Sequence, residues 1–233
     1  MTFEILRKQP VKFYQQNGIK FFEPFKAVDK FKKPLELSWN SHPVSPSIRA
    51  KSTYNNDASI YDMEIDYFNK ELKGTSIVAQ PKNKGIGEVL NLASLITFKE
   101  NNFSEYNVFA LRDYIQFYTK YGFNILTNNI NEIVHNLKII AKSKDKRFSD
   151  LADSAQFFIK KIDKATEKEK LNYFSLSNNL VSDYLRNLAR NGEKADHNDL
   201  YSHTHMHFTT MDTARNKDYI NKLLDKHEIN YEI

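Results

Sequence analysis

The sequence contains no cysteine, and this absence excludes several kinds of chemistry. A chain without cysteine has no disulfide, no thiol nucleophile and no thiolate-bound zinc or iron–sulfur site. It also lacks an apolar run of the roughly 18 residues that a membrane-spanning helix needs. The first ten residues, MTFEILRKQP, do not contain the apolar stretch of a signal peptide. We therefore expect a cytoplasmic protein without a membrane span.

The composition is nevertheless that of a folded protein, because 40% of the residues are hydrophobic and the chain has 17 Phe and 13 Tyr. We expect a single domain over residues 1–233. The net charge of +5 gives only a weak preference for anionic partners. Short lysine runs such as Lys30–Lys33 are typical of solvated loops, and no aromatic-interleaved basic motif accompanies them. A nucleic-acid partner is therefore not expected.

The first half of the chain alternates between strand and helix patterns. Ile48–Thr53 and Ser59–Phe68 flank a turn-like YNND at Tyr54–Asp57 and predict a hairpin. Further along, the pattern predicts an α/β layout in which a glycine loop connects a strand to a helix. The expected elements are a strand at Thr75–Gln80, a helix that ends near Asn101, a strand at Tyr106–Leu111, a helix capped by Asp113 and ended by Gly122, and a strand at Phe123–Leu126.

The second half is mainly helical. Apolar residues at helical spacing predict three amphipathic helices between about Ile130 and Arg190. After them the pattern predicts a strand at Ser202–Thr209, a helix around Asn216–Lys226 and an edge strand at Ile229–Ile233.

The segment QPKNKGIGEVL, Gln80–Leu90, contains two of the six glycines and leads into a predicted helix. A helix N-terminus has unpaired N–H groups and a partial positive charge, so it can bind a phosphate where glycine lets the ligand approach. A tight connection that needs glycine only for its dihedral angles would give the same pattern. The segment is neither a P-loop nor a dinucleotide fingerprint, because Gly87 is not followed by Lys-Ser/Thr and Leu90 is not glycine.

A second segment, FYTKYGF at Phe117–Phe123, lies one helix and one strand beyond the glycine loop. Lys82–Gly87 and Phe117–Phe123 together resemble the two signatures of the GNAT superfamily of acyl-CoA-dependent acetyltransferases. The resemblance covers roughly residues 75–126. It implies a mixed, mostly antiparallel sheet flanked by helices, with acetyl-CoA as co-substrate, a primary amine as acceptor and no metal. The residues implied in binding the acyl-CoA are Ile77, Val78, Ala79, Lys82, Asn83, Lys84, Gly85, Ile86, Gly87 and Glu88.

The resemblance also implies catalytic roles. Tyr118 matches the family tyrosine that protonates the departing thiolate, although a tyrosine in an amphipathic helix also serves packing. Glu64 and Asp66 lie on a strand that is expected beside the acceptor cleft, so either could act as general base or simply face solvent. His203, His205 and His207 would share one face of a strand and could bind a divalent metal or reach the acceptor, but no carboxylate is interleaved with them.

The helices over residues 129–199 would then be an insertion between the last two core strands. They could select the acceptor, or serve stability or a homodimer. Two alternatives to acetyl transfer stay open at this point. One is an N-acyl synthase of the same fold that uses longer acyl chains, and the other is a non-catalytic GNAT-like module that binds a protein or nucleic acid.

Overall fold

The computed structural model describes residues 9–40, 42, 46–54, 58–195, 201 and 203–233. The chain forms two compact units. The first unit contains residues 1–106 and 209–233, and the second contains residues 107–208. The turn predicted at residues 54–57 and the end of the expected 129–199 insertion lie partly outside the described residues.

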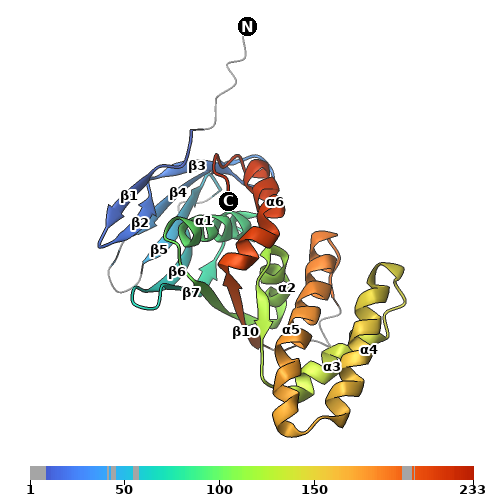
Figure 1. The fold of residues 1–233 in the computed structure, drawn as a ribbon. Helices are drawn as coiled ribbons and strands as arrows, with labels where there is room; N and C mark the ends of the chain where they lie inside the picture. The colour runs from blue at the N-terminus through green and yellow to red at the C-terminus, as the bar shows by residue number, and fades with distance from the viewer. Residues whose placement is uncertain (1–8, 41, 43–45, 55–57, 196–200, 202) are drawn as a thin grey trace. The chain divides into compact units, whose positions relative to one another are not determined.

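The first unit is built on antiparallel strands (Figure 1). Strands β1 (Phe13–Gln16) and β2 (Ile19–Phe22) form a separate hairpin. A sheet follows with its strands in chain order, each paired with the next. Its strands are β3 (Phe25–Val28), β4 (Pro34–Asn40), β5 (Ser47–Ser52), β6 (Ser59–Asp66) and β7 (Glu71–Val78).

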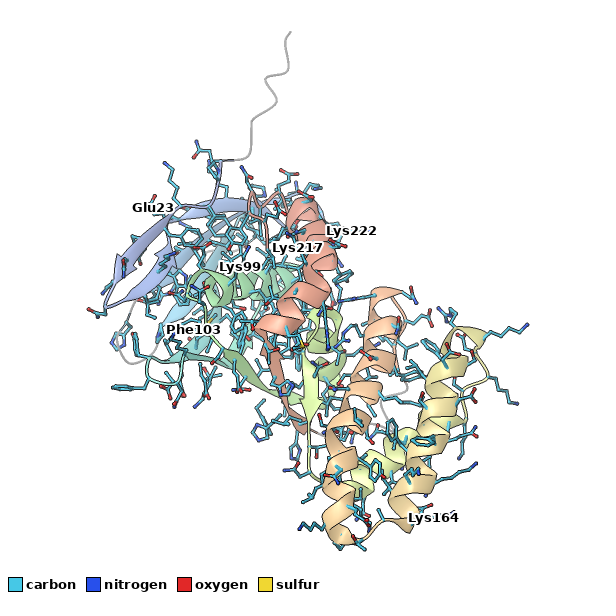
Figure 2. The ribbon with its side chains drawn as sticks, in the orientation of Figure 1. Glu23, Lys99, Phe103, Lys164, Lys217 and Lys222 are labelled. Carbon is cyan, nitrogen blue, oxygen red and sulfur yellow. The ribbon has the colours of Figure 1, made fainter. Side chains whose placement is uncertain are left out.

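Two helices complete the first unit. Helix α1 (Ile86–Glu100) packs on β5, β6 and β7, and most of its side chains are buried, so it is the central helix of this unit. Helix α6 (Thr210–Lys226) packs on α1 and is amphipathic: Ile220 and Leu223 are buried, while Lys217 and Lys222 point outward (Figure 2). None of the helices in the described ranges is both long enough and apolar enough to span a bilayer.

A buried tyrosine pair joins α1 to the sheet. Tyr106 Oη lies 2.6 Å from Tyr61 Oη and 2.9 Å from Ser94 Oγ of α1. The position of Tyr61 also explains why residue 74 on the neighbouring strand is a glycine. A Cβ added to Gly74 would lie 2.3 Å from Tyr61 Oη, which is too close. The sheet therefore needs glycine at this position so that the tyrosine ring can cross the strand.

Replacing Gly74 with alanine should destabilise the first unit, because the added methyl group must displace the Tyr61 side chain. The expected loss in the free energy of unfolding is about 1–3 kcal/mol, the usual cost of overpacking a core. Urea denaturation measures it. Gly74→Ala should cost less stability when it is introduced into the Tyr61→Phe variant, which lacks the hydroxyl group that the methyl group would meet. If Gly74→Ala costs the same in the wild type and in Tyr61→Phe, this explanation is wrong.

The second unit contains the remaining elements. Strands β8 (Glu105–Leu111), β9 (Asn124–Leu126) and β10 (His203–Thr209) have the order β8-β10-β9, with β9 and β10 antiparallel. The terminal residues Glu105, Tyr106 and Thr209 of these strands are counted with the first unit. Helix α2 (Arg112–Tyr121) packs on α5 (Glu167–Arg190), and α3 (Ile130–Ala141) and α4 (Ser149–Lys164) pack on each other and on α5. Figure 1 shows α3, α4 and α5 as a helical group between β9 and β10 in chain order.

Helix α5 is tied to the strand and helix beside it through polar side chains. Ser182 Oγ accepts a hydrogen bond from Ile125 N of β9 at 2.8 Å. Arg186 donates to Asn124 Oδ1 at 2.8 Å and to the carbonyl oxygen of Thr119 at 3.2 Å. These contacts satisfy main-chain and side-chain groups of β9 and α2, so α5 is an integral part of this unit.

Most of the predicted elements are observed. The mixed α/β fold with a mostly antiparallel sheet is confirmed, as is the hairpin, whose strands β5 and β6 pair from Ser47↔Asp62 to Ala50↔Ser59. Gly122 ends α2 with a left-handed φ of 110°, as expected. Strand β7 begins earlier than predicted, at Glu71, and contains Gly74.

Two predictions were wrong. Asp113 does not cap α2: the helix begins at Arg112 with Leu111 as its extended N-cap and no side-chain cap, because β8 continues into α2 without a loop. Ile229–Ile233 is not an edge strand. Only Asn230 makes an isolated parallel bridge, to Pro10.

Candidate functional site

The glycine loop lies in the first unit between β7 and α1. Gln80 is fixed at the start of the loop, since Ser59 Oγ accepts from Gln80 N at 2.9 Å and donates to the Gln80 carbonyl at 3.1 Å. Asn83 and Gly85 both have left-handed φ values, 64° and 84°. Helix α1 then starts at Ile86, and its N-cap, Gly85, supplies no side-chain acceptor. The first turn of α1 therefore has no side-chain cap for its N–H groups.

The two glycines have different structural reasons. A Cβ at Gly85 would lie 3.2 Å from both Cβ and N of Lys30, and its left-handed φ already disfavours other residues. A Cβ at Gly87 would meet Ala79 Cβ at 3.6 Å and Ile77 Cδ1 at 3.9 Å, which are ordinary contacts. The structure thus requires glycine at position 85 and tolerates a methyl group at position 87.

The turn between β3 and β4 packs directly on the glycine loop. Lys30 N donates to the Lys84 carbonyl at 3.0 Å. The Lys84 ammonium lies 4.7 Å from the centre of the Phe31 ring and 5.1 Å from that of Tyr54, and Lys30 Nζ lies 4.9 Å from the Phe31 ring. Cation–π attraction holds both ammonium groups beside the loop. Lys82 and Asn83, which the sequence also predicted to bind the acyl-CoA, are exposed.

The Asp29 carboxylate holds this turn in place through hydrogen bonds. It accepts from Phe31 N at 2.7 Å, from Lys33 N at 2.9 Å and from Tyr54 Oη at 2.5 Å. Burial by itself would raise the pKa of Asp29, but these hydrogen bonds and the Lys84 charge outweigh it and hold the pKa below its ordinary value. The hydrogen bond to this carboxylate raises the pKa of Tyr54 to about 12.

A lowered folded-state pKa means that the Asp29 carboxylate stabilises the fold above its unfolded pKa of about 3.9, and that this contribution disappears as the pH falls through the folded-state pKa. Tyr54→Phe removes one of the hydrogen bonds that lower the pKa. The free energy of unfolding should therefore fall less steeply below about pH 4 in this variant than in the wild type. Denaturation between neutral and acidic pH measures the slopes, with the exposed Tyr67→Phe as control, and equal slopes for Tyr54→Phe and wild type would contradict the assignment.

The first turn of α1 is anchored on its inner side by Glu88. The Glu88 carboxylate accepts from Lys226 Nζ at 2.6 Å and lies 2.7 Å from Nε2 of the fully buried His227. His227 Nδ1 lies 2.6 Å from the carbonyl oxygen of Val28, which can only accept, so Nδ1 carries a proton. The side chain of Glu88 is engaged within the protein, and only its main chain remains for the ligand contact predicted from the sequence.

Strand β7 leads into the loop with Ile77 opposite Tyr61 and Val78 opposite Ile60 of β6. Ala79 follows the strand, outside its registered pairs. On β6, Glu64 is exposed and lies opposite Lys73.

Asp66 has a structural role at the end of β6. Its Oδ1 accepts from Phe68 N and Asn69 N, both at 3.0 Å, and its Oδ2 accepts from Asn69 Nδ2 at 2.9 Å. The hydrogen bonds from Asn69 are the main reason that its pKa is lowered. The structure thus gives Asp66 the role of a turn cap and leaves Glu64 more accessible.

Tyr118 lies in the second unit, on α2. It is 6% exposed, and its ring packs edge-on against two phenylalanine rings. The distance between ring centres is 5.2 Å to Phe117 and 5.3 Å to Phe123. Phe123 in turn contacts Phe208 of β10 at 5.1 Å. The aromatic packing fixes the orientation of the tyrosine ring.

The three histidines of β10 do share one face, since Thr204, Met206 and Phe208 between them are buried. The Phe109 ring lies 5.3 Å from that of His203 and 5.0 Å from that of His205. Over the described ranges, no group of three His, Cys, Asp or Glu residues is placed to hold a metal ion. The contact with Phe109 accounts for the imidazoles of His203 and His205 as part of a surface cluster.

Neither the family models nor the curated proteins that were compared with the sequence match it. Two solved acetyltransferases are similar to this chain. A GNAT family acetyltransferase from Elizabethkingia anophelis, solved with acetyl-CoA bound, is 23% identical over 36% of this chain and 57% of that chain, with a TM-score of 0.32. Nourseothricin acetyltransferase is 15% identical over 51% of this chain and 70% of that chain, with a TM-score of 0.32. This chain therefore matches little more than half of the Elizabethkingia GNAT protein.

Proposed function

We propose that the protein transfers an acetyl group from acetyl-CoA to a primary amine. The observation that supports this most directly is the glycine loop, where Gly85 opens a helix whose first turn has no side-chain cap and whose neighbours are Lys30, Lys82 and Lys84. Uncapped N–H groups, the helix dipole and fixed ammonium groups together suit a diphosphate. The resemblance of Lys82–Gly87 and Phe117–Phe123 to the GNAT signatures supports an acyl-CoA as the molecule that carries this diphosphate.

In the proposed reaction the neutral amine attacks the thioester carbonyl carbon. A main-chain N–H at the end of β7, within Ile77–Ala79, stabilises the negative charge on the oxygen of the tetrahedral intermediate. The C–S bond then breaks, and the thiolate takes the phenolic proton of Tyr118. Glu64 removes the extra proton of the attacking amine, directly or through water. The products are the acetylated amine and free CoA, and exchange with solvent removes the proton from Glu64 and returns one to Tyr118 before the next turnover.

The test begins with the purified full-length protein. Mass spectrometry under native conditions should detect CoA or acyl-CoA bound in one copy per chain, and the mass of the acyl group identifies the donor. Thiol release from acetyl-CoA with a panel of primary amines then identifies the acceptor class. If the protein shows no affinity for CoA by either native mass spectrometry or calorimetry, the proposal is wrong.

A further inference from the structure

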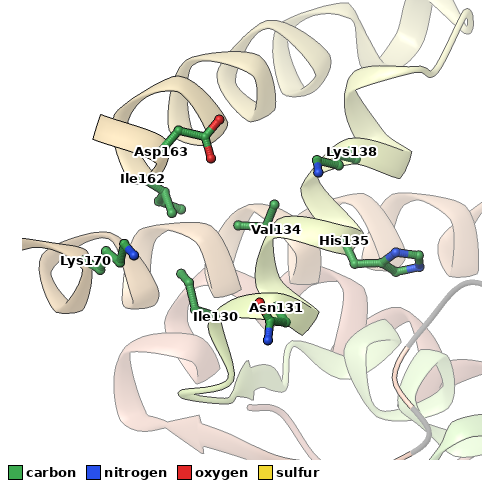
Figure 3. A pocket seen from close by; sticks show the side chains of 8 residues that line it. All are labelled: Ile130, Asn131, Val134, His135, Lys138, Ile162, Asp163 and Lys170. Carbon is green, nitrogen blue, oxygen red and sulfur yellow. The ribbon is translucent and has the colours of Figure 1, made fainter. Parts of the chain in front are cut away.

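A hollow of about 440 Å³ lies within the helical part of the second unit, where the end of α4 and the start of α5 meet α3 (Figure 3). Its size falls in the range of about 300–1,000 Å³ that small-molecule sites have. The residues that line it are Ile130, Asn131, Val134, His135, Lys138, Ile162, Asp163 and Lys170. All of them belong to one compact unit, so the hollow is a feature of that unit alone.

Three aliphatic side chains form the floor of the hollow, and polar atoms make up most of the lining that solvent reaches. Ile130 and Val134 are one helical turn apart on α3 and partly exposed, and Ile162 of α4 is 2% exposed. Figure 3 shows the three aliphatic side chains close together at the centre of the hollow. An apolar group of a ligand would be removed from water on this floor, which favours binding.

Charged groups of both signs surround the floor. Figure 3 shows the Asp163 carboxylate on the α4 side and the Lys138 ammonium on the α3 side, both turned toward the hollow. Among the residues that the structure describes, neither Asp163 nor Lys138 makes an ion pair within 4.0 Å. Lys170, the other lysine at the rim, is already paired with Glu167. One carboxylate and one ammonium thus face the same hollow without being paired to each other.

We propose that this hollow binds a zwitterion with an apolar body, the chemistry of a free apolar amino acid. The ligand ammonium pairs with Asp163, the ligand carboxylate pairs with Lys138, and the apolar side chain covers the partly exposed Ile130 and Val134. Opposite charges attract the ammonium of the ligand to Asp163 and its carboxylate, on the same α-carbon, to Lys138. A ligand with a single charge would leave either Asp163 or Lys138 without a partner. This site is separate from the proposed acyl transfer and does not depend on it.

Three compounds with the same phenyl body test the proposal on the full-length protein. L-Phenylalanine has both charges, 3-phenylpropionate lacks the ammonium, and 2-phenylethylamine lacks the carboxylate. Calorimetry or ligand-observed NMR should show that phenylalanine binds about fivefold more tightly than either analogue, the upper end of what one solvent-exposed ion pair contributes. Equal affinity for the three compounds, or no binding of phenylalanine at its solubility limit, would overturn the proposal.

Two substitutions locate the binding. Asp163→Asn should lower the affinity for phenylalanine about fivefold and leave the affinity for 3-phenylpropionate unchanged. Lys138→Gln should lower the affinity for phenylalanine and leave the affinity for 2-phenylethylamine unchanged. Asp153→Asn and Lys160→Gln, two exposed residues of α4 outside the hollow, are the matched controls and should change nothing. A general loss of structure would weaken all three ligands together, so the selective pattern separates a ligand contact from a folding effect. An equal loss of affinity for phenylalanine in the two control variants would contradict the proposed binding site.

The charge-swapped double variant Asp163→Lys/Lys138→Asp provides a further check. It keeps one charge of each sign around the unchanged floor, so phenylalanine should again bind better than its single-charge analogues, in the reversed orientation. Loss of this preference in a folded double variant would show that the two charges do not act as a pair.

Discussion

Tyr118→Phe is expected to lower the rate of acetyl transfer by about 10²- to 10⁴-fold, the usual contribution of a general acid. The substitution removes only the phenolic proton donor and keeps the ring that packs on Phe117 and Phe123. Binding of CoA should therefore change little, and kcat should fall. Steady-state kinetics together with calorimetry for CoA separate the two effects.

The control for Tyr118 is Tyr114→Phe on the same helix, because Tyr114 is 48% exposed and has no proposed role. It should retain the rate of the wild type. If both variants keep full activity while the protein binds CoA, then the proton reaches the thiolate from another group and the role of Tyr118 is packing alone.

Gly85→Ala is expected to damage both the fold and the binding of CoA. Alanine at a φ of 84° is strained, and its Cβ would press on Lys30 at 3.2 Å, so the free energy of unfolding should fall by about 1–3 kcal/mol. The main chain of the loop must shift to relieve this contact. Because hydrogen bonds to a charged group contribute about 1.5–3 kcal/mol, the loss of one such N–H contact should weaken CoA roughly tenfold or more. Chemical denaturation and calorimetry measure the two effects.

Gly87→Ala is the matched comparison, two residues away in the same loop. Its Cβ would make only ordinary contacts with Ala79 and Ile77, and alanine is a better helix former than glycine. Stability should stay equal or rise slightly, with CoA binding retained. Equal damage from both substitutions would show that the loop needs glycine for a reason other than the backbone angle and contact at Gly85.

The elements that follow from local pattern could be predicted from the sequence. Gly85 and Gly122 both mark helix ends with left-handed φ values, and the alternation of apolar residues in β5 and β6 places their side chains on the correct faces. The start of α2 could not be predicted from Asp113, because a strand that continues into a helix leaves no loop for a capping side chain. Gly74 has its reason in Tyr61, which only the pairing of two strands brings together.

The surroundings of the glycine loop depend on contacts between distant parts of the sequence. Glu88 and His227 are 139 positions apart, and nothing in the local pattern around either residue predicts the pairing. A weaker signal was present at Lys30–Lys33, where Phe31 stands between lysines. That run is the exposed turn that the sequence predicts, and its Phe31 ring also supports the ammonium groups of Lys30 and Lys84 beside the glycine loop.

The division of the chain also has a consequence for its biosynthesis. Residues 1–106 and 209–233 form one unit, so the ribosome makes the whole helical segment before the last part of the first unit exists. The nascent N-terminal portion lacks α6, Lys226 and His227, so the contacts of Glu88 with Lys226 and His227 form only after residues 209–233 are made. Domains generally fold as units during translation. We therefore expect the first unit to complete its packing only after residues 209–233 have been synthesised, whereas all of residues 107–208 are made earlier.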